Sequence, residues 1–345
     1  MSRKEINRYY YQLRFKDSIF DLFTAPRLAL KFNIIYFGLL GIVIAYTISL
    51  ISSFFVMKFF SGNYHDFHFA GIIPLLLPNR YLPFFANFIL FIGYTISICT
   101  IMGSSLGIAV RIVEELKGDR DFKISHMRTY IKENIFTIFF LPIGFFLLLF
   151  FLMGISGILI MMLKIPVIGK FLMIIVVPLV WLIALVLVLT VAATIVGVMF
   201  FPAIVVTWDS DVKAVIFQAF SILWSRPWML IGGSLISLWN TIISFLGAFF
   251  LFSAGFWILK RMFTMVGILN TRVHLPDFTI SSLKNFNVYT EFIHLPLLEK
   301  FVAFWYVIIV TTAIAYALCT FVASQTLLFI RLKKIENDID LLKIK

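Results

Sequence analysis

Few side chains in this 345-residue sequence combine a reactive type with a useful spacing. His65, Asp66 and His68 stand together, and two histidines three residues apart can reach one metal ion from one face of a helix. Two histidines and one acid in a short segment are more typical of a solvated or headgroup-facing loop. We therefore expect no metal site.

Catalytic and cofactor-binding groups are scarce. The sequence has no Gly-rich phosphate-binding loop, no His-Glu-x-x-His pair and no pair of carboxylates within an apolar run. All five histidines fall between the apolar runs, which disfavours a proton relay and bis-histidine haem ligation. We expect a protein that is not an enzyme and that binds no cofactor.

Uncharged polar residues cluster in the apolar runs, and a subset of them could line a path for a solute. Small residues and hydroxyls also let membrane helices pack closely, with the hydroxyls bonded back to their own helix, and we favour this second interpretation. The candidate residues, which we call the polar seam, are Thr95, Ser97, Thr100, Ser104, Ser105, Asn240 and Tyr316.

The composition shows which elements must hold these residues. Hydrophobic residues make up 61% of the chain and charged residues 13%, against roughly 25% charged residues in a soluble domain. The two cysteines, Cys99 and Cys319, lie within apolar stretches and indicate packing rather than a disulfide. An ordinary soluble enzyme is excluded.

Six stretches lack Asp, Glu, Lys and Arg, and each exceeds the roughly 20 residues that cross a bilayer. Without an alternating polar face they cannot be barrel strands, so we expect an all-α polytopic membrane protein with six transmembrane helices. Pro202 is expected to kink or end the fourth helix near its exit. The stretches are residues 32–57, 81–110, 134–163, 171–208, 227–259 and 301–330.

The distribution of basic residues predicts the orientation. Alternate loops place 20 Lys and Arg on one side and 9 on the other, so the positive-inside rule puts both termini in the cytoplasm of a bacterial plasma (inner) membrane. The net charge of +12 divides into +7 inside (20 basic, 13 acidic) and +5 outside (9 basic, 4 acidic). Basic residues on both faces, next to anionic headgroups, explain this net positive charge, so nucleic acid is not needed as a partner.

A short amphipathic segment precedes each odd-numbered transmembrane helix. Residues 15–25, 122–132 and 212–225 carry apolar side chains at helical spacing, which suits helices that lie flat at the cytoplasmic surface. Pro26 and Pro227 are expected to turn the chain into the bilayer. The apolar triplets are Ile19, Leu22 and Phe23; Met127, Tyr130 and Ile131; and Phe220, Leu223 and Trp224.

We therefore expect one integral membrane domain over residues 1–345, built from three units of an elbow helix and a transmembrane hairpin. A basic cytoplasmic segment over residues 1–31 contains the first elbow and is too long and too charged for a cleaved signal peptide. The units cover about residues 15–116, 122–208 and 212–330, and residues 331–345 form a cytoplasmic tail.

Two patches resemble known membrane families. Residues 107–119, a helix that runs into a charged Gly-containing turn, resemble a pattern in uncharacterised bacterial multi-pass families. Residues 201–206 and 212–228 are similar to the membrane domain fused to some glycerophosphodiester phosphodiesterases, although the chain has no phosphodiesterase catalytic domain. The resemblance implies the six-helix elbow architecture and transfers no functional residue.

The functional expectation follows from the uncharged helices and the missing catalytic groups. We expect a non-catalytic accessory or organising subunit of a membrane complex, or a lipid-associated protein, whose partners are membrane lipids and other integral membrane proteins. The alternative is a permease or channel for a neutral or amphipathic solute that uses the polar seam.

Overall fold

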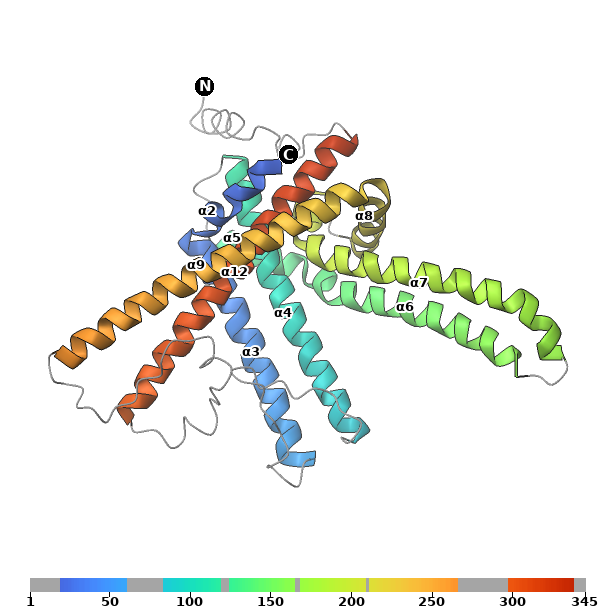
Figure 1. Cartoon of the computed structure of the whole chain (residues 1–345), viewed down its shortest axis with the longest axis horizontal. Helices are drawn as coiled ribbons and strands as arrows, with labels where there is room; N and C mark the ends of the chain where they lie inside the picture. The colour runs from blue at the N-terminus through green and yellow to red at the C-terminus, as the bar shows by residue number, and fades with distance from the viewer. Residues whose placement is uncertain are drawn as a thin grey trace. The chain divides into compact units, whose positions relative to one another are not determined.

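The computed structural model describes residues 19–60, 83–118, 124–164, 168–208, 211–265 and 297–337, and its regular structure over these residues is entirely helical (Figure 1). His65, Asp66 and His68 lie outside the described residues, as do much of the basic N-terminal segment and the end of the tail. The elements are η1 (Ile19–Thr24), α2 (Ala25–Ala29), α3 (Phe32–Phe60), α4 (Phe84–Leu116), α5 (Ile124–Glu133), α6 (Ile135–Met162), α7 (Ile168–Thr207), α8 (Val212–Ser225), α9 (Pro227–Met265) and α12 (Leu297–Asn337).

Six of these helices are long and apolar enough to cross a membrane, which confirms the expected number of candidate spans. They are α3, α4, α6, α7, α9 and α12, and their apolar stretches run from 25 to 36 residues. The chain is therefore an all-helical protein of multi-pass membrane type. The stretches are Phe32–Val56, Phe84–Leu116, Ile135–Met162, Leu172–Thr207, Pro227–Gly255 and Ile308–Lys333.

Two helices extend beyond the uncharged stretches that predicted them, and a third runs through a proline. α4 continues past Arg111 to Leu116, as expected for a helix that runs into the turn near Gly118, and Gly118, with a positive φ of 90°, follows its end. α7 runs through Pro202 as far as Thr207, so the helix does not end at this proline, and a kink there stays a prediction. α12 continues past Arg331 to Asn337. Charge and proline near a helix end do not stop a helix that tertiary packing supports.

Short helical segments precede α3, α6 and α9, as the amphipathic spacing predicts. On α5 the expected face is the one that packs, since Met127 is buried and Tyr130 is half-buried. On α8 the packed face contains Val215, Ala219 and Ile222, whereas Trp224 is 82% exposed. Contact with α6 and α7 thus buries a different side of α8 from the expected triplet, whose placement at the membrane surface stays a prediction. The first segment is a 3-10 turn followed by one short α-helix rather than a single helix.

The chain groups into two compact units, each assembled from separate segments. Unit 1 contains residues 1–25, 106–238 and 322–345, and unit 2 contains residues 26–105 and 239–321. The divisions fall inside the continuous helices α2, α4, α9 and α12. A single domain of three elbow units remains a prediction.

In unit 2, α3 packs closely against both α4 and α12. A Cβ placed on Gly41 would overlap the side chain of Ser104, and one on Gly38 would lie 2.5 Å from Cys319 Sγ. Near the other end of α3, Val56 packs with Ala86 and Leu90 of α4. Small residues thus allow helix backbones to approach one another, which is the usual basis of packing between membrane helices.

In unit 1, α6 and α7 form an antiparallel hairpin that packs on α8 (Figure 1). Phe145 of α6 is buried against Gly197 of α7, where an added Cβ would lie 2.6 Å from the ring. Gly144 of α6 faces Ile216 of α8. These contacts gather toward one end of the hairpin.

Candidate functional site

All seven residues of the polar seam lie in unit 2. Thr95 and Thr100 donate hydrogen bonds back to their own helix, to Phe91 O at 2.8 Å and Ile96 O at 2.9 Å. Such bonds satisfy a hydroxyl without any partner from another helix or a solute.

Ser97 connects α4 to α3. Its buried Oγ lies 2.9 Å from Ser49 Oγ, 3.0 Å from Ala45 O and 2.9 Å from Gly93 O. A single hydroxyl hydrogen serves one of these acceptors at a time, so the contact is a shared polar junction between two helices.

The remaining seam residues are also packed among helices. Ser104 donates to Ile101 O at 2.9 Å, and Ser105 and Asn240 are buried. Tyr316 of α12 donates to Pro26 O of α2 at 3.1 Å. The bonds at Ser97 and Tyr316 therefore cross between elements of unit 2, which is what hydroxyls that hold helices together do.

One catalytic spacing is present in the sequence, although the scarcity of catalytic groups predicts none. Residues Gly103, Ser104, Ser105, Leu106 and Gly107 match the spacing Gly-x-Ser-x-Gly. In hydrolases this spacing forms a sharp turn between a strand and a helix that exposes the serine. Here it lies in the interior of α4 and Ser105 is buried, so the geometry of a nucleophile elbow is missing.

Several charged side chains in unit 1 are buried, which the sequence did not predict. Lys333 of α12 is 2% exposed and Glu115 of α4 is 1% exposed, and Arg111 is also buried. A fourth charged residue, Arg331, is partly buried, with Nε and Nη1 enclosed and without a hydrogen-bond partner. The available signal was position: Arg111 and Arg331 are the first charges after two uncharged stretches.

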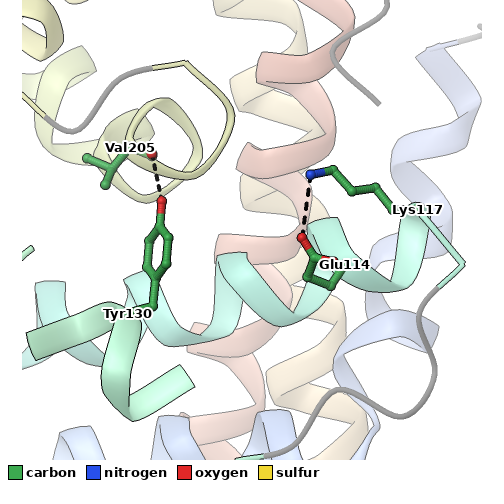
Figure 2. Close-up of polar contacts among 4 residues, drawn as sticks. All are labelled: Glu114, Lys117, Tyr130 and Val205. Carbon is green, nitrogen blue, oxygen red and sulfur yellow. Dashed lines mark hydrogen bonds and ion pairs between the residues drawn. The ribbon is translucent and has the colours of Figure 1, made fainter. Parts of the chain in front are cut away.

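Tyr130 links the end of α7 to α5, as Figure 2 shows. Its hydroxyl donates to Val205 O at 2.9 Å, while on α4 Lys117 Nζ lies 3.4 Å from Glu114 Oε1. Burial raises the pKa of the Tyr130 phenol to about 12, helped by the negative charges of Glu133 and Glu114. The phenol therefore stays a neutral donor at physiological pH.

Lys333 and Phe329 connect α12 to the end of α7. Lys333 Nζ lies 5.1 Å from the centroid of the Trp208 ring, within the range of a cation–π contact. The rings of Phe329 and Phe200 are 6.2 Å apart. Together with Tyr130, these contacts fix the end of α7 to both α5 and α12.

α9 packs along α12 in the same unit. Gln325 Nε2 lies 3.2 Å from Ser237 Oγ, and Leu328 lies against Gly233. Gln325 Oε1 and Ser324 Oγ are buried without a hydrogen-bond partner. Buried polar atoms without partners are uncommon and mark places where another polar group can be accommodated.

Exposed apolar faces dominate the α6–α7 hairpin. In an 18-residue apolar part of α7 only 6% of the residues are buried, compared with 78% in such a part of α12, although the end of α7 around Phe200 is buried. The rings of Phe136 and Phe140, and of Phe146 and Phe150, stack along the outer surface of α6. Such faces must be covered by lipid or by the helices of another protein.

No group of three or more His, Cys, Asp or Glu in the described residues could hold a metal ion. A scan against protein-family models, a search of curated proteins and a search of solved structures found no match to the chain. The arguments that follow therefore rest on the residues of this chain alone.

Proposed function

We propose that this chain is a non-catalytic integral membrane protein that serves as an accessory or organising subunit of a membrane complex. Its partners would be other integral membrane proteins and the surrounding lipids. The observation that carries the proposal is the exposure of the α6–α7 hairpin: in an 18-residue apolar part of α6 only 22% of the residues are buried within the chain, and in such a part of α7 only 6%.

Lipid alone can cover an apolar helix, so exposure by itself does not require a protein partner. Two features of the hairpin favour one. Stacked phenylalanine rings present large, shaped surfaces, and aromatic residues are enriched at protein interfaces. Gly154 and Gly157 of α6 face open space, where another helix could approach closely.

The proposed orientation has both termini in the cytoplasm of a bacterial inner membrane, as the 20 and 9 basic residues on alternate sides favour. In this arrangement η1 with α2, α5 and α8 would be elbow helices at the cytoplasmic surface. Exposed Phe217, Trp224 and Trp228 around the start of α9 support that placement, because tryptophan is enriched at the membrane interface.

Apolar exchanges on the hairpin test the proposal, because lipid tolerates a change of apolar shape and a packed partner does not. We expect F150L/F151L to weaken co-purification of a partner from native membranes by about tenfold, since aromatic contacts contribute about 0.5–1.5 kcal/mol each. Phe54→Leu on α3, at a similarly exposed position, is the control and should leave the partner in place. Equal recovery from all variants, or no companion in gentle purification, would remove the support for an accessory role.

A permease or channel for a neutral or amphipathic solute is the second candidate. It is favoured by the buried polar side chains Asn240 and Ser244 on α9, where Ser244 Oγ has no hydrogen-bond partner. Alanine at Ser104, Ser105 and Asn240 should abolish transport in reconstituted vesicles and leave assembly intact. An accessory subunit would show no solute flux that depends on these residues.

A further inference from the structure

We propose that Arg331 forms part of a binding site for a phosphoryl group, at the end of α12 in unit 1. This goes beyond the proposed accessory role, which concerns the α6–α7 hairpin.

The charges of this region do not balance. Arg111 and Lys333 are buried cations, Glu115 is a buried anion and Arg331 adds a third cation, which leaves a formal charge of +2. Arg111 and Glu115 stand four residues apart on α4, a spacing at which opposite charges interact. The Lys333 ammonium lies over the Trp208 ring. Arg331 has no such compensation.

The unsatisfied atoms belong to the guanidinium itself. Arg331 Nε and Nη1 are both enclosed and neither has a hydrogen-bond partner. Enclosing charged donors without acceptors is unfavourable, so the arrangement favours an acceptor next to Nε and Nη1. A guanidinium cannot lose its proton to relieve the cost, which leaves an anion as the natural occupant.

The start of α9 lies toward Arg331 along α12. Gln325 contacts Ser237 and Leu328 contacts Gly233, so α9 runs antiparallel to α12 and its first turn lies toward the level of Arg331. α9 begins at Pro227, directly after Arg226. The N-terminus of a long helix carries partial positive charge, which adds to the attraction for an anion.

The position along the helix indicates the kind of anion. The apolar stretch of α12 is Ile308–Lys333, so Arg331 lies two residues before its end. Lipid phosphates are found at this boundary between hydrocarbon and water. Phosphate oxygens also match the several N–H donors of arginine. The shared chemistry is a phosphoryl group, supplied either by a lipid headgroup or by a free phosphate.

The test measures binding to the full chain in detergent by native mass spectrometry and thermal unfolding. The probes are phosphatidylglycerol, diacylglycerol, which lacks the phosphoryl group, and inorganic phosphate. R331Q is compared with R128Q, which removes an exposed arginine from α5 in the same unit. We expect R331Q to weaken phosphatidylglycerol binding about tenfold, the loss expected for a charged hydrogen bond, with R128Q unchanged and diacylglycerol bound equally by both.

Unfolding temperatures measured without ligand distinguish a variant that has lost binding from one that is misfolded. R331Q should be at least as stable as the unchanged chain when no ligand is present and should lose the stabilisation that phosphatidylglycerol gives. R331K, which keeps the charge but not the guanidinium, should fall between the two. An Arg331-dependent response to inorganic phosphate alone would assign the site to a free phosphate. Equal responses of R331Q and R128Q to both phosphoryl probes would overturn the proposal, and the co-purification result for the hairpin is independent of either outcome.

Discussion

Adjacent glycines on α9 give a sharp prediction about packing. Gly233 faces α12: an added Cβ would lie 2.7 Å from Leu328 Cδ2 and 3.1 Å from its Cγ. Gly232 has nothing within 4 Å of the same position. We expect G233A to destabilise the protein relative to G232A, because only the first alanine collides with a buried side chain.

The magnitude follows from the overlap. A Cβ normally keeps at least about 3.4 Å from its neighbours, and Leu328 Cδ1 would be nearer to it than Cδ2, so this fully buried side chain would have to move by more than about 0.7 Å. Overpacking a closed core typically costs about 1–3 kcal/mol. Both substitutions gain the same helix propensity, roughly 1 kcal/mol, so the difference between the two variants isolates the collision.

The assay uses the two cysteines of the chain, Cys99 and Cys319, which are both buried. A thiol-reactive dye therefore reports unfolding in detergent as these side chains become accessible. We expect G233A to unfold at least about 2 °C below G232A, and L328A added to G233A should recover part of the difference, since the two changes share one contact. Equal unfolding temperatures for the two glycine variants would refute the packing of α9 on α12 described above.

Three further predictions concern individual hydrogen bonds. Y130F should cost about 1 kcal/mol in the same assay, because Val205 O loses its donor, whereas T129A, which removes an exposed hydroxyl, should stay within about 0.5 kcal/mol. The contribution of Tyr130 to the free energy of unfolding should be complete below pH 10 and should fade as the pH rises toward 12. The reason is that its folded pKa of about 12 exceeds the unfolded value of 10.0, so the folded state favours the protonated phenol. If the 295 nm absorbance titration of Y130F lacks no ionisation step above pH 10 relative to the unchanged chain, this prediction is contradicted. S97A should weaken the contact between α3 and α4 by about 1 kcal/mol, while T100V, which removes a hydroxyl bonded to its own helix, should have a smaller effect on the unfolding temperature.

The six long helices could be predicted because each uncharged run exceeds the length needed to cross a bilayer. The burial of charges at their ends could not. The helix was expected to run into the charged turn near Gly118, but the structure buries Arg111 and Glu115 on it. A rule that defines a span by the absence of charge cannot find charges that tertiary contacts enclose, so Lys333 was missed for the same reason.

The faces of short helices depend even more on tertiary contacts. The apolar spacing of α5 includes Met127, which the structure buries. On α8 almost every side is apolar, and its partners α6 and α7 select Val215 rather than Trp224. Local sequence supplied several equivalent faces here, and only the arrangement of the hairpin distinguishes among them.

The polar seam illustrates a similar limit. The sequence located the hydroxyls on their helices but not their acceptors. Thr100 bonds to its own helix, while Ser97 reaches α3 and Tyr316 reaches the carbonyl of Pro26, far away in the sequence. Hydrogen bonds between distant segments follow from the fold rather than from local spacing.

The central claim is that another membrane protein covers the α6–α7 hairpin. The most direct measurement is photo-crosslinking in native membranes, with a photoreactive amino acid at Trp181 or Leu182, which are exposed on α7, and at buried Phe145 as the control. The account predicts a defined crosslink from both α7 positions to one membrane protein, identified by mass spectrometry, and none from Phe145. Crosslinks only to lipid from both exposed positions would contradict it.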